Sequence, residues 1–365
     1  MEEWVSSGNG ISRRSLLAAG AAAAGAGALA RPALAQSRIE WSMVTSWPKN
    51  LPGPGVSAER IARDIETASR GRMVVQVRAA GEIVPALAVF DAVSEGTAEM
   101  AHTASLFWAG KAKAAPVFTA APFGLTPLEH ITWIDHGGGQ ALWDELYRPF
   151  GVKPFMAGNT GFQMGGWYRG EINSLDDFKG LKIRMPGLGG EVARRLGATP
   201  VSLPASEILP ALQSGTIDAT EFLGPWSDLA MGFWQVAKNY YWPGFHEPNG
   251  TGEGLVSISA WQELPDDLKA IVRHVLAVEN IRGLGEAEWE NARALEQLTQ
   301  DKGVVLRRFP DDFLAAARQA SDDVFDELAE TGGVQTEIVE SYRSARARMQ
   351  PWSEVSEAAL LAARR

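Results

Sequence analysis

The chain of 365 residues contains no cysteine. This absence excludes disulfides, iron–sulfur clusters, thiolate zinc sites and cysteine nucleophiles. The five histidines include no HExxH pair, so the zinc motif of helical metalloproteases is missing as well. No GxGxxG follows an expected strand, residues 137–139 (Gly-Gly-Gly) precede no Lys-Ser/Thr pair, and neither Ser105 nor Ser206 lies in a nucleophile elbow. The absence of these motifs favours a binding protein over an enzyme.

Positive charge is also scarce. The sequence has 34 Lys and Arg against 44 Asp and Glu, a net charge of -10, which argues against an electrostatic grip on nucleic acid or anionic lipid. An anionic ligand would therefore need a local cationic site. Charged residues make up 21% and hydrophobic residues 45%, close to the globular averages of about 25% and about 45–50%. Beyond residue 35, charges, Gly or Pro interrupt every apolar stretch before it could span a membrane.

The first 35 residues have the order of an export signal. Residues 12–17 (Ser-Arg-Arg-Ser-Leu-Leu) precede an Ala/Gly/Leu run over residues 18–30, and residues 33–35 (Ala-Leu-Ala) form a small-x-small cleavage site. The apolar run is shorter than the roughly 20 residues that a membrane anchor needs. The pattern predicts twin-arginine export, cleavage before Gln36 and a soluble periplasmic protein.

Strands and helices alternate in two separate regions. The first region has expected strands at 39–44, 73–78 and 99–102, with helices at 57–69 and 87–94 between them. The second has expected strands at 182–185, 200–203 and 218–222, with helices at 190–196 and 206–213. Alternation of such short elements predicts two α/β units with mostly parallel sheets.

A weak internal repeat links the two units. Residues 92–101 align without gaps on residues 211–220, each in the order helix, Gly, Thr, acidic residue, strand. A common glycine stop at αβ turns explains the match equally simply. If the units face each other, a ligand is expected at the carboxyl ends of their strands, which are residues 102–105 and 221–222.

The chain becomes helical from Pro265. Helices are expected over residues 266–300, 311–331 and 335–363, the last kinked or broken at Pro351. A narrow apolar stripe on that last helix needs a surface to pack on. Its own body and a second subunit are both open as that surface.

Four side chains suit a site for an organic anion and a cation. Arg184 ends an expected strand just before a helix, where a planar guanidinium can pair with a carboxylate, although a surface arginine is the simpler explanation. Glu221 ends another strand among apolar residues, where an ionised carboxylate must be paired or bind a cation. Glu247 and Gln163 add an acid and an amide in loops. A general acid–base pair of Glu221 and Glu247, as in a periplasmic lyase or hydrolase, remains the enzymatic alternative.

At Gln163, Arg184 and Glu221-Phe222, and most clearly over residues 173–184 (NSLDDFKGLKIR), the chain resembles the extracytoplasmic solute receptors of tripartite ATP-independent periplasmic (TRAP) transporters. Within that family it resembles the branch that binds 2-oxo or 2-hydroxy monocarboxylates with a cation. The resemblance implies an α/β periplasmic binding protein fold of two lobes with a ligand cleft between them and a long C-terminal helical region. It places lobe I at residues 36–160 with part of 248–310, lobe II at 161–247, and C-terminal helices at 311–365.

The resemblance also implies roles for single residues. Arg184 would bind the substrate carboxylate, and Na⁺ or Ca²⁺ would be held by Gln163, Glu221, the main-chain oxygen of Phe222, and Glu247. The position of Phe222 is often Trp in these relatives, so the pocket wall is smaller here. The remaining residues expected at the substrate are Gln163 and Phe222 themselves, with Thr45, Phe107, Trp108 and Asn159.

The implied function is capture, without catalysis, of a small acid such as pyruvate or lactate and its delivery to a membrane permease. Relatives of this branch dimerise by exchanging a C-terminal helix, which would give the last helix its partner. A receptor for a larger or aromatic carboxylate is the alternative within the class, given thirteen tryptophans. Nucleic acid is not an expected partner.

Overall fold

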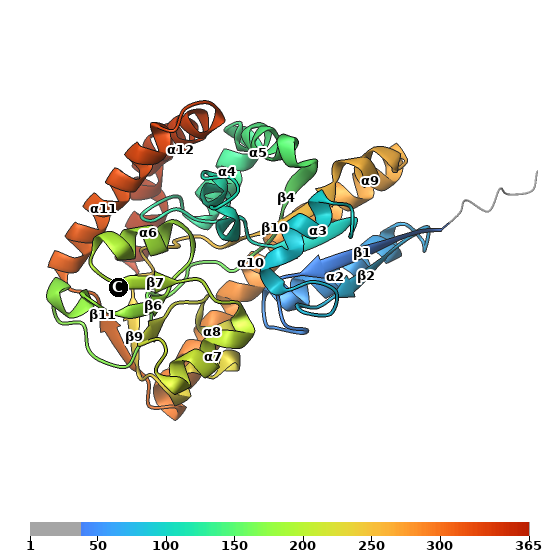
Figure 1. The fold of residues 1–365 in the computed structure, drawn as a ribbon. Coiled ribbons are helices and arrows are strands. Elements are labelled where there is room, and N and C mark those ends of the chain that lie inside the picture. The colour runs from blue at the N-terminus through green and yellow to red at the C-terminus, as the bar shows by residue number, and fades with distance from the viewer. Residues whose placement is uncertain (1–37, 365) are drawn as a thin grey trace, which may run out of the picture. The chain divides into compact units, whose positions relative to one another are not determined.

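The computed structural model describes residues 38–364. The predicted export signal over residues 1–35 lies outside the described residues. Within the described part no helix combines the length and the apolar character that a membrane crossing requires. Two sheets organise this part of the chain, and helices pack around them (Figure 1).

The first sheet has the strand order β2-β1-β3-β10-β4. Its strands are β1 (Ile39–Thr45), β2 (Met73–Arg78), β3 (Met100–Thr103), β4 (Val152–Asn159) and β10 (Thr251–Ser257). The second sheet has the order β11-β9-β5-β8-β6-β7. Its strands are β5 (Gly166–Tyr168), β6 (Lys182–Arg184), β7 (Thr199–Val201), β8 (Ala219–Thr220), β9 (Asn239–Trp242) and β11 (Val305–Arg308).

Both sheets are mixed, which corrects the expectation of mostly parallel sheets. β1 and β3 are parallel, but β10 runs antiparallel to β3 and β4. In the second sheet β5 is antiparallel to β8 and β9, whereas β6 is parallel to β7 and β8. The cause is the path of the chain: it leaves the first sheet after β4, builds most of the second, and returns through β10, which lies beside β4 in the opposite direction.

The helices surround these sheets. They are α2 (Pro54–Ala68), α3 (Val89–Ser94), α4 (Pro127–His136), α5 (Gly139–Tyr147), α6 (Gly187–Arg195), α7 (Ala205–Ser214), α8 (Pro225–Met231), α9 (Ile258–Glu263), α10 (Asp266–Asp301), α11 (Asp311–Ala329), α12 (Val334–Ser353) and α13 (Ala359–Ala363). Helix α10 contacts α2 and β4 on one side of the molecule and α8 on the other. It therefore links the elements that carry the two sheets.

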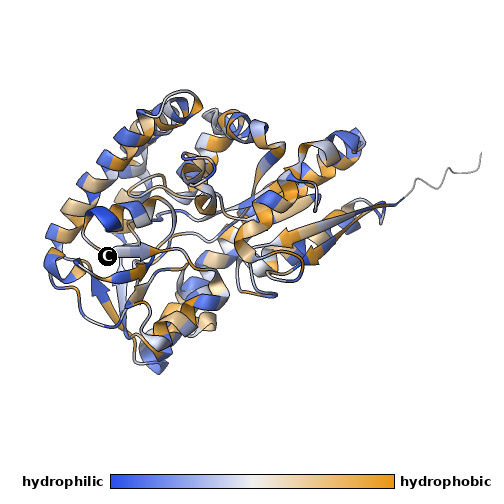
Figure 2. Cartoon of the chain, viewed as in Figure 1, coloured by the Kyte–Doolittle hydropathy of each residue, from blue (hydrophilic) through white to orange (hydrophobic). Residues whose placement is uncertain are grey.

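The last helix follows the sequence expectation except at its proline. Pro351 lies inside α12 without ending it, and the chain passes through a π-helical turn at Glu354–Ala358 before α13. Pro351 removes one backbone donor from the helix, and the π-helical turn begins C-terminal to it. Hydrophobic and hydrophilic residues alternate around α11 and α12 (Figure 2), and Ile338, Val339 and Tyr342 of α12 are buried in this chain's own core.

A buried acid, Glu253, belongs to the central strand pair of the first sheet. Glu253 of β10 is fully buried, and its Oε2 accepts a hydrogen bond from Trp108 Nε1 at 2.8 Å. Burial raises the pKa of Glu253 to about 8, although the Trp108 hydrogen bond opposes the shift. The folded state therefore favours the protonated carboxyl relative to the unfolded chain.

Replacing Glu253 by Gln is expected to flatten the pH dependence of stability. Because the folded pKa is the higher one, the contribution of Glu253 is complete below about pH 4.5 and is lost as pH rises through about 8, with a slope of at most about 1.4 kcal/mol per pH unit. Urea unfolding at pH 5 to 8 measures that slope. Glu263→Gln, on the exposed surface of α9, is the control and should keep the wild-type slope. An unchanged slope in Glu253→Gln would contradict the assignment.

Candidate functional site

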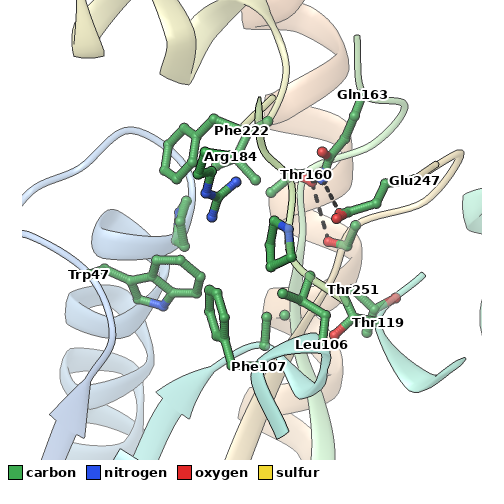
Figure 3. A pocket seen from close by; sticks show the side chains of 16 residues that line it. Trp47, Leu106, Phe107, Thr119, Thr160, Gln163, Arg184, Phe222, Glu247 and Thr251 are labelled. Carbon is green, nitrogen blue, oxygen red and sulfur yellow. Dashed lines mark hydrogen bonds between the residues drawn. The ribbon is translucent and has the colours of Figure 1, made fainter. Parts of the chain in front are cut away.

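A pocket lies where strands of the two sheets end. The chain enters its wall at Ala104, directly after β3, at Arg184, the last residue of β6, and at Phe222, two residues after β8. Carboxyl ends of strands are where open α/β sheets bind ligands. Figure 3 shows Arg184 and Phe222 facing Trp47 and Phe107 across this space. The strand ends that the sequence singled out are therefore brought together.

Arg184 is the cation of the pocket and is held in one orientation. Its Nη1 donates to the side-chain Oε1 of Glu221 at 2.6 Å and to the main-chain oxygen of Glu221 at 2.9 Å. The guanidinium carbon lies 5.5 Å from the centre of the Phe222 ring, a cation–π distance. Nη2 makes no hydrogen bond within residues 38–364. The guanidinium is buried beside the pocket, and its Nη2 has two free N–H groups. These groups can donate hydrogen bonds to the carboxylate of a ligand.

Glu221 lies behind Arg184, outside the pocket lining, and is fully buried. Its second oxygen, Oε2, is 3.0 Å from Nε2 of His246. Glu221, His246 and Glu247 each offer an atom to a cluster in which all three atoms lie within 4.8 Å of one another. The structure thus joins Glu221, which directly follows β8, to two residues of the segment between β9 and β10.

Glu247 and Gln163 complete the polar side of the pocket. Gln163 Nε2 donates to Glu247 Oε2 at 2.9 Å, and both residues line the pocket (Figure 3). Burial, followed by the charge of Glu221, raises the pKa of Glu247 well above its usual value, while Arg184 opposes the rise. Two buried carboxyl groups this close destabilise each other's ionised form.

A hard cation fits this donor set. The buried Oε1 of Gln163 has no hydrogen-bond partner in the described structure, so one amide oxygen at the site lacks a donor or a cation. Carboxylate, amide and carbonyl oxygens are the ligands that Na⁺ and Ca²⁺ prefer. Gln163, Glu221, Glu247 and the main-chain oxygen of Phe222 are the atoms that would hold it, and the ion would supply the positive charge that two buried carboxylates lack.

Three of the predicted substrate residues lie one layer away from the pocket. Thr45 Oγ1 donates to the main-chain oxygen of Trp47, and Trp108 donates to Glu253. Asn159 donates to Asn249 and accepts from the backbone N–H of Gly161, which holds the segment leading to Gln163. Phe107, by contrast, lines the pocket directly.

Sequence reasoning overlooked two residues of the site. Trp47 forms a pocket wall, and its Nε1 donates to Nδ1 of buried His102 at 2.9 Å. The sequence gives a signal for Trp47, because this residue follows the first strand in a Pro-rich loop. His246 precedes Glu247 in the sequence, but no spacing indicates that it reaches Glu221.

The family profile described as bacterial extracellular solute-binding protein, family 7 (DctP) matches residues 44–331. The monocarboxylate 2-oxoacid-binding periplasmic protein of Nostoc sp. is 39% identical over 319 residues, 87% of each chain. The sialic acid-binding periplasmic protein SiaP of Vibrio cholerae is 24% identical over 254 residues, 66% of this chain and 73% of its own.

Two solved structures extend these similarities to the fold. A TRAP periplasmic solute-binding protein of Pseudoalteromonas atlantica, with bound sodium and pyruvate, is 35% identical with a TM-score of 0.86, and the match covers 89% of this chain and 98% of that one. A TRAP solute-binding protein of Bordetella bronchiseptica, a mixed-occupancy dimer with calcium and picolinate, is 35% identical with a TM-score of 0.87, covering 88% and 96%.

Proposed function

Because this chain belongs to family 7 of the bacterial extracellular solute-binding proteins, the periplasmic receptors of TRAP transporters, we propose that it captures a small 2-oxo or 2-hydroxy monocarboxylate together with Na⁺ or Ca²⁺. Proteins of this family bind solutes and work with membrane permease subunits; they are not enzymes. The predicted fold and receptor class are thereby confirmed.

The observation that carries the proposed ligand is the pairing of Arg184 with two buried acids beside an unpartnered amide oxygen. The free Nη2 of Arg184 suits one carboxylate, and Glu221 and Glu247 with Gln163 suit one cation. A 2-oxo or 2-hydroxy acid has a carboxylate and a neighbouring oxygen. The carboxylate can bind Arg184 while the neighbouring oxygen binds the cation. The Nostoc relative, which is named for 2-oxoacids, and the Pseudoalteromonas relative, whose structure holds sodium and pyruvate, support the same choice.

The rest of the wall limits the ligand to one with an apolar body. Trp47, Leu106 and Phe107 lie across the pocket from Arg184, and the Phe222 ring lies beside the guanidinium (Figure 3). Such a wall leaves no second cation for a second carboxylate, which disfavours dicarboxylates. It also suits an aromatic acid, so picolinate, held by the Bordetella relative, is the second candidate ligand.

A thermal unfolding screen tests the ligand class. With Ca²⁺ or Na⁺ present, pyruvate, lactate or a longer 2-oxo acid should raise the melting temperature, whereas succinate and sialic acid should not. Proton NMR of the same mixtures should show the acid unchanged over hours. Stabilisation by dicarboxylates alone would refute the proposed ligand, and consumption of the acid would favour the lyase or hydrolase alternative with Glu221 and Glu247.

We also propose a homodimer through the C-terminal segment. Trp352, Val355, Leu360 and Leu361 are large apolar side chains that remain between 48% and 72% exposed in the single chain. Isolated exposed residues are common, but four within ten residues of one terminal helical segment suggest a covered surface in an assembly.

Ending the chain after Gln350 is expected to convert a dimer into a monomer. This cut removes the four exposed side chains and keeps Ile338, Val339 and Tyr342, which the chain's own core needs. Multi-angle light scattering measures the mass, and circular dichroism checks that the shortened protein folds. A monomeric full-length protein, or an unchanged dimer after truncation, would contradict the assignment.

Export through the twin-arginine pathway is the remaining proposal, and the Arg13-Arg14 pair supports it. Replacing both by Lys should retain the precursor in the cytoplasm, which cell fractionation would detect, while export of that variant would contradict the pathway.

A further inference from the structure

His246 is a buried imidazole with a single hydrogen-bond partner. It is 1% exposed, its Nε2 lies 3.0 Å from Glu221 Oε2, and its Nδ1 has no partner in the described structure. On the other side of the same carboxylate, Arg184 Nη1 lies 2.6 Å from Oε1. Each oxygen of Glu221 therefore meets its own nitrogen.

Two roles are compatible with the position of His246 beside Glu221 and Glu247. It could be a third ligand of the cation, because its ring nitrogen belongs to the cluster of three atoms within 4.8 Å. Alternatively it could be a hydrogen-bond donor to Glu221. For Nε2, the nitrogen that faces Glu221, these roles require opposite tautomers, since a ligand nitrogen must be bare and a donor nitrogen must carry hydrogen.

The surroundings of Nδ1 decide between them. Metal-bound histidines almost always donate their other ring N–H to an acceptor, but Nδ1 of His246 is buried without one. Hydrogen on Nδ1 would bury an unsatisfied donor and would also place bare Nε2 against a carboxylate oxygen at 3.0 Å. Hydrogen on Nε2 instead allows His246 to donate a hydrogen bond to Glu221 Oε2. The bare Nδ1 is then an acceptor without a donor.

We propose that His246 is a positioning residue that fixes Glu221 by donating from Nε2, and that Nε2 is therefore not a ligand of the cation. The inference rests on the proposed function, because the fixed carboxylate matters through Arg184 and the cation. With one oxygen held by His246, the other stays on Arg184 Nη1, so Nη2 remains turned to the pocket.

Packing holds the imidazole in this orientation. A side-chain carbon added at Gly189 of α6 would lie 2.9 Å from His246 Cβ, so the helix approaches the histidine as closely as a glycine allows. The Phe245 ring meets the imidazole edge-on with a centroid distance of 5.6 Å. These contacts restrict the movement of the His246 side chain, so its Nε2–H is preorganised to donate to Glu221.

Two substitutions test the donor role by calorimetric titration of pyruvate in Ca²⁺. His246→Gln keeps an N–H donor, and we expect its affinity to remain within about threefold of wild type. His246→Leu keeps the bulk without the donor, and the loss of a hydrogen bond to a charged group predicts at least about tenfold weaker binding. His274→Leu, at an exposed position of α10, should bind like wild type. Equal affinities for all three variants, or equal losses in the Gln and Leu variants, would overturn the proposal.

Nitrogen-15 NMR of the histidine side chains reads the tautomer directly, with His246→Gln identifying the signal. We expect the Nε2–H tautomer in the free protein and again with Ca²⁺ and pyruvate. An Nδ1–H tautomer in either state, or a metal-shifted Nε2 with Ca²⁺, would overturn the donor role. If wild-type protein bound neither pyruvate nor Ca²⁺, the proposed function would fail. The tautomer of His246 in the free protein would still test its role as a donor to Glu221. The same spectrum settles the question if His246→Leu fails to fold.

Discussion

Pyruvate is expected to lose all stabilising effect on the protein once cations are removed by chelation and dialysis into choline salts. Glu247, whose pKa is raised, then lines the pocket, and the carboxyl group of Glu221 lies behind Arg184 and engages its Nη1. An incoming carboxylate would be a third carboxyl group in a buried site with one guanidinium, so the three groups could not all be ionised together without a cation. Repulsion between like charges in such surroundings far exceeds its value in water.

Restoring Na⁺ or Ca²⁺ should recover the melting-temperature shift and identify the ion. Glu221→Gln makes the test stricter, because it preserves shape and removes one charge. This variant should need a higher cation concentration for half-maximal pyruvate binding, yet suffer less repulsion in the absence of cation. If wild-type protein binds pyruvate equally well in choline chloride with chelator, the cation site is refuted, and the two glutamates become structural acids.

Arg184→Lys is expected to weaken binding of the acid by at least about tenfold, although the charge is kept. Lysine has no planar fork, so it cannot hold Glu221 and a ligand carboxylate at the same time through separate nitrogens. Each lost charge-assisted hydrogen bond is worth about 1.5–3 kcal/mol. Arg184→Met should also destabilise the fold by about 3–5 kcal/mol, because it leaves the buried Glu221 without its cationic partner.

Calorimetry in saturating Ca²⁺ measures the affinity of the Arg184 variants, and urea unfolding measures their stability. Arg194→Lys provides the matched control, since Arg194 lies on α6 with its side chain mostly exposed and pairs with Glu191 at the surface. Its affinity and stability should equal those of wild type. Unchanged affinity in Arg184→Lys would remove Arg184 from the binding site.

The parts of the site that follow from strand ends were predictable from sequence. Arg184 ends the short strand β6 and Glu221 directly follows the short strand β8, and the sheet brings such strand ends together without any long-range detail. The bounds of α10 and α11 were likewise predictable, because charged N-terminal turns and a continuous helical period define them locally.

The rest depends on contacts between distant segments. Strand β4 contains Pro154 and Gly158, which weaken its strand signal, and its pairing with β10 is set only when the chain returns from the second sheet. The roles of Trp47 and His246 depend on partners 55 and 25 residues away, His102 and Glu221. No period in the sequence carries such information.

The most direct measurement of the central claim is mass spectrometry of small molecules released by denaturing freshly purified protein isolated from the periplasm. The arrangement of Arg184, Glu221, Glu247 and Gln163 predicts a 2-oxo or 2-hydroxy monocarboxylate at close to one per chain, accompanied by sodium or calcium in elemental analysis. Recovery of a dicarboxylate, a sialic acid or an uncharged solute in that ratio would contradict it.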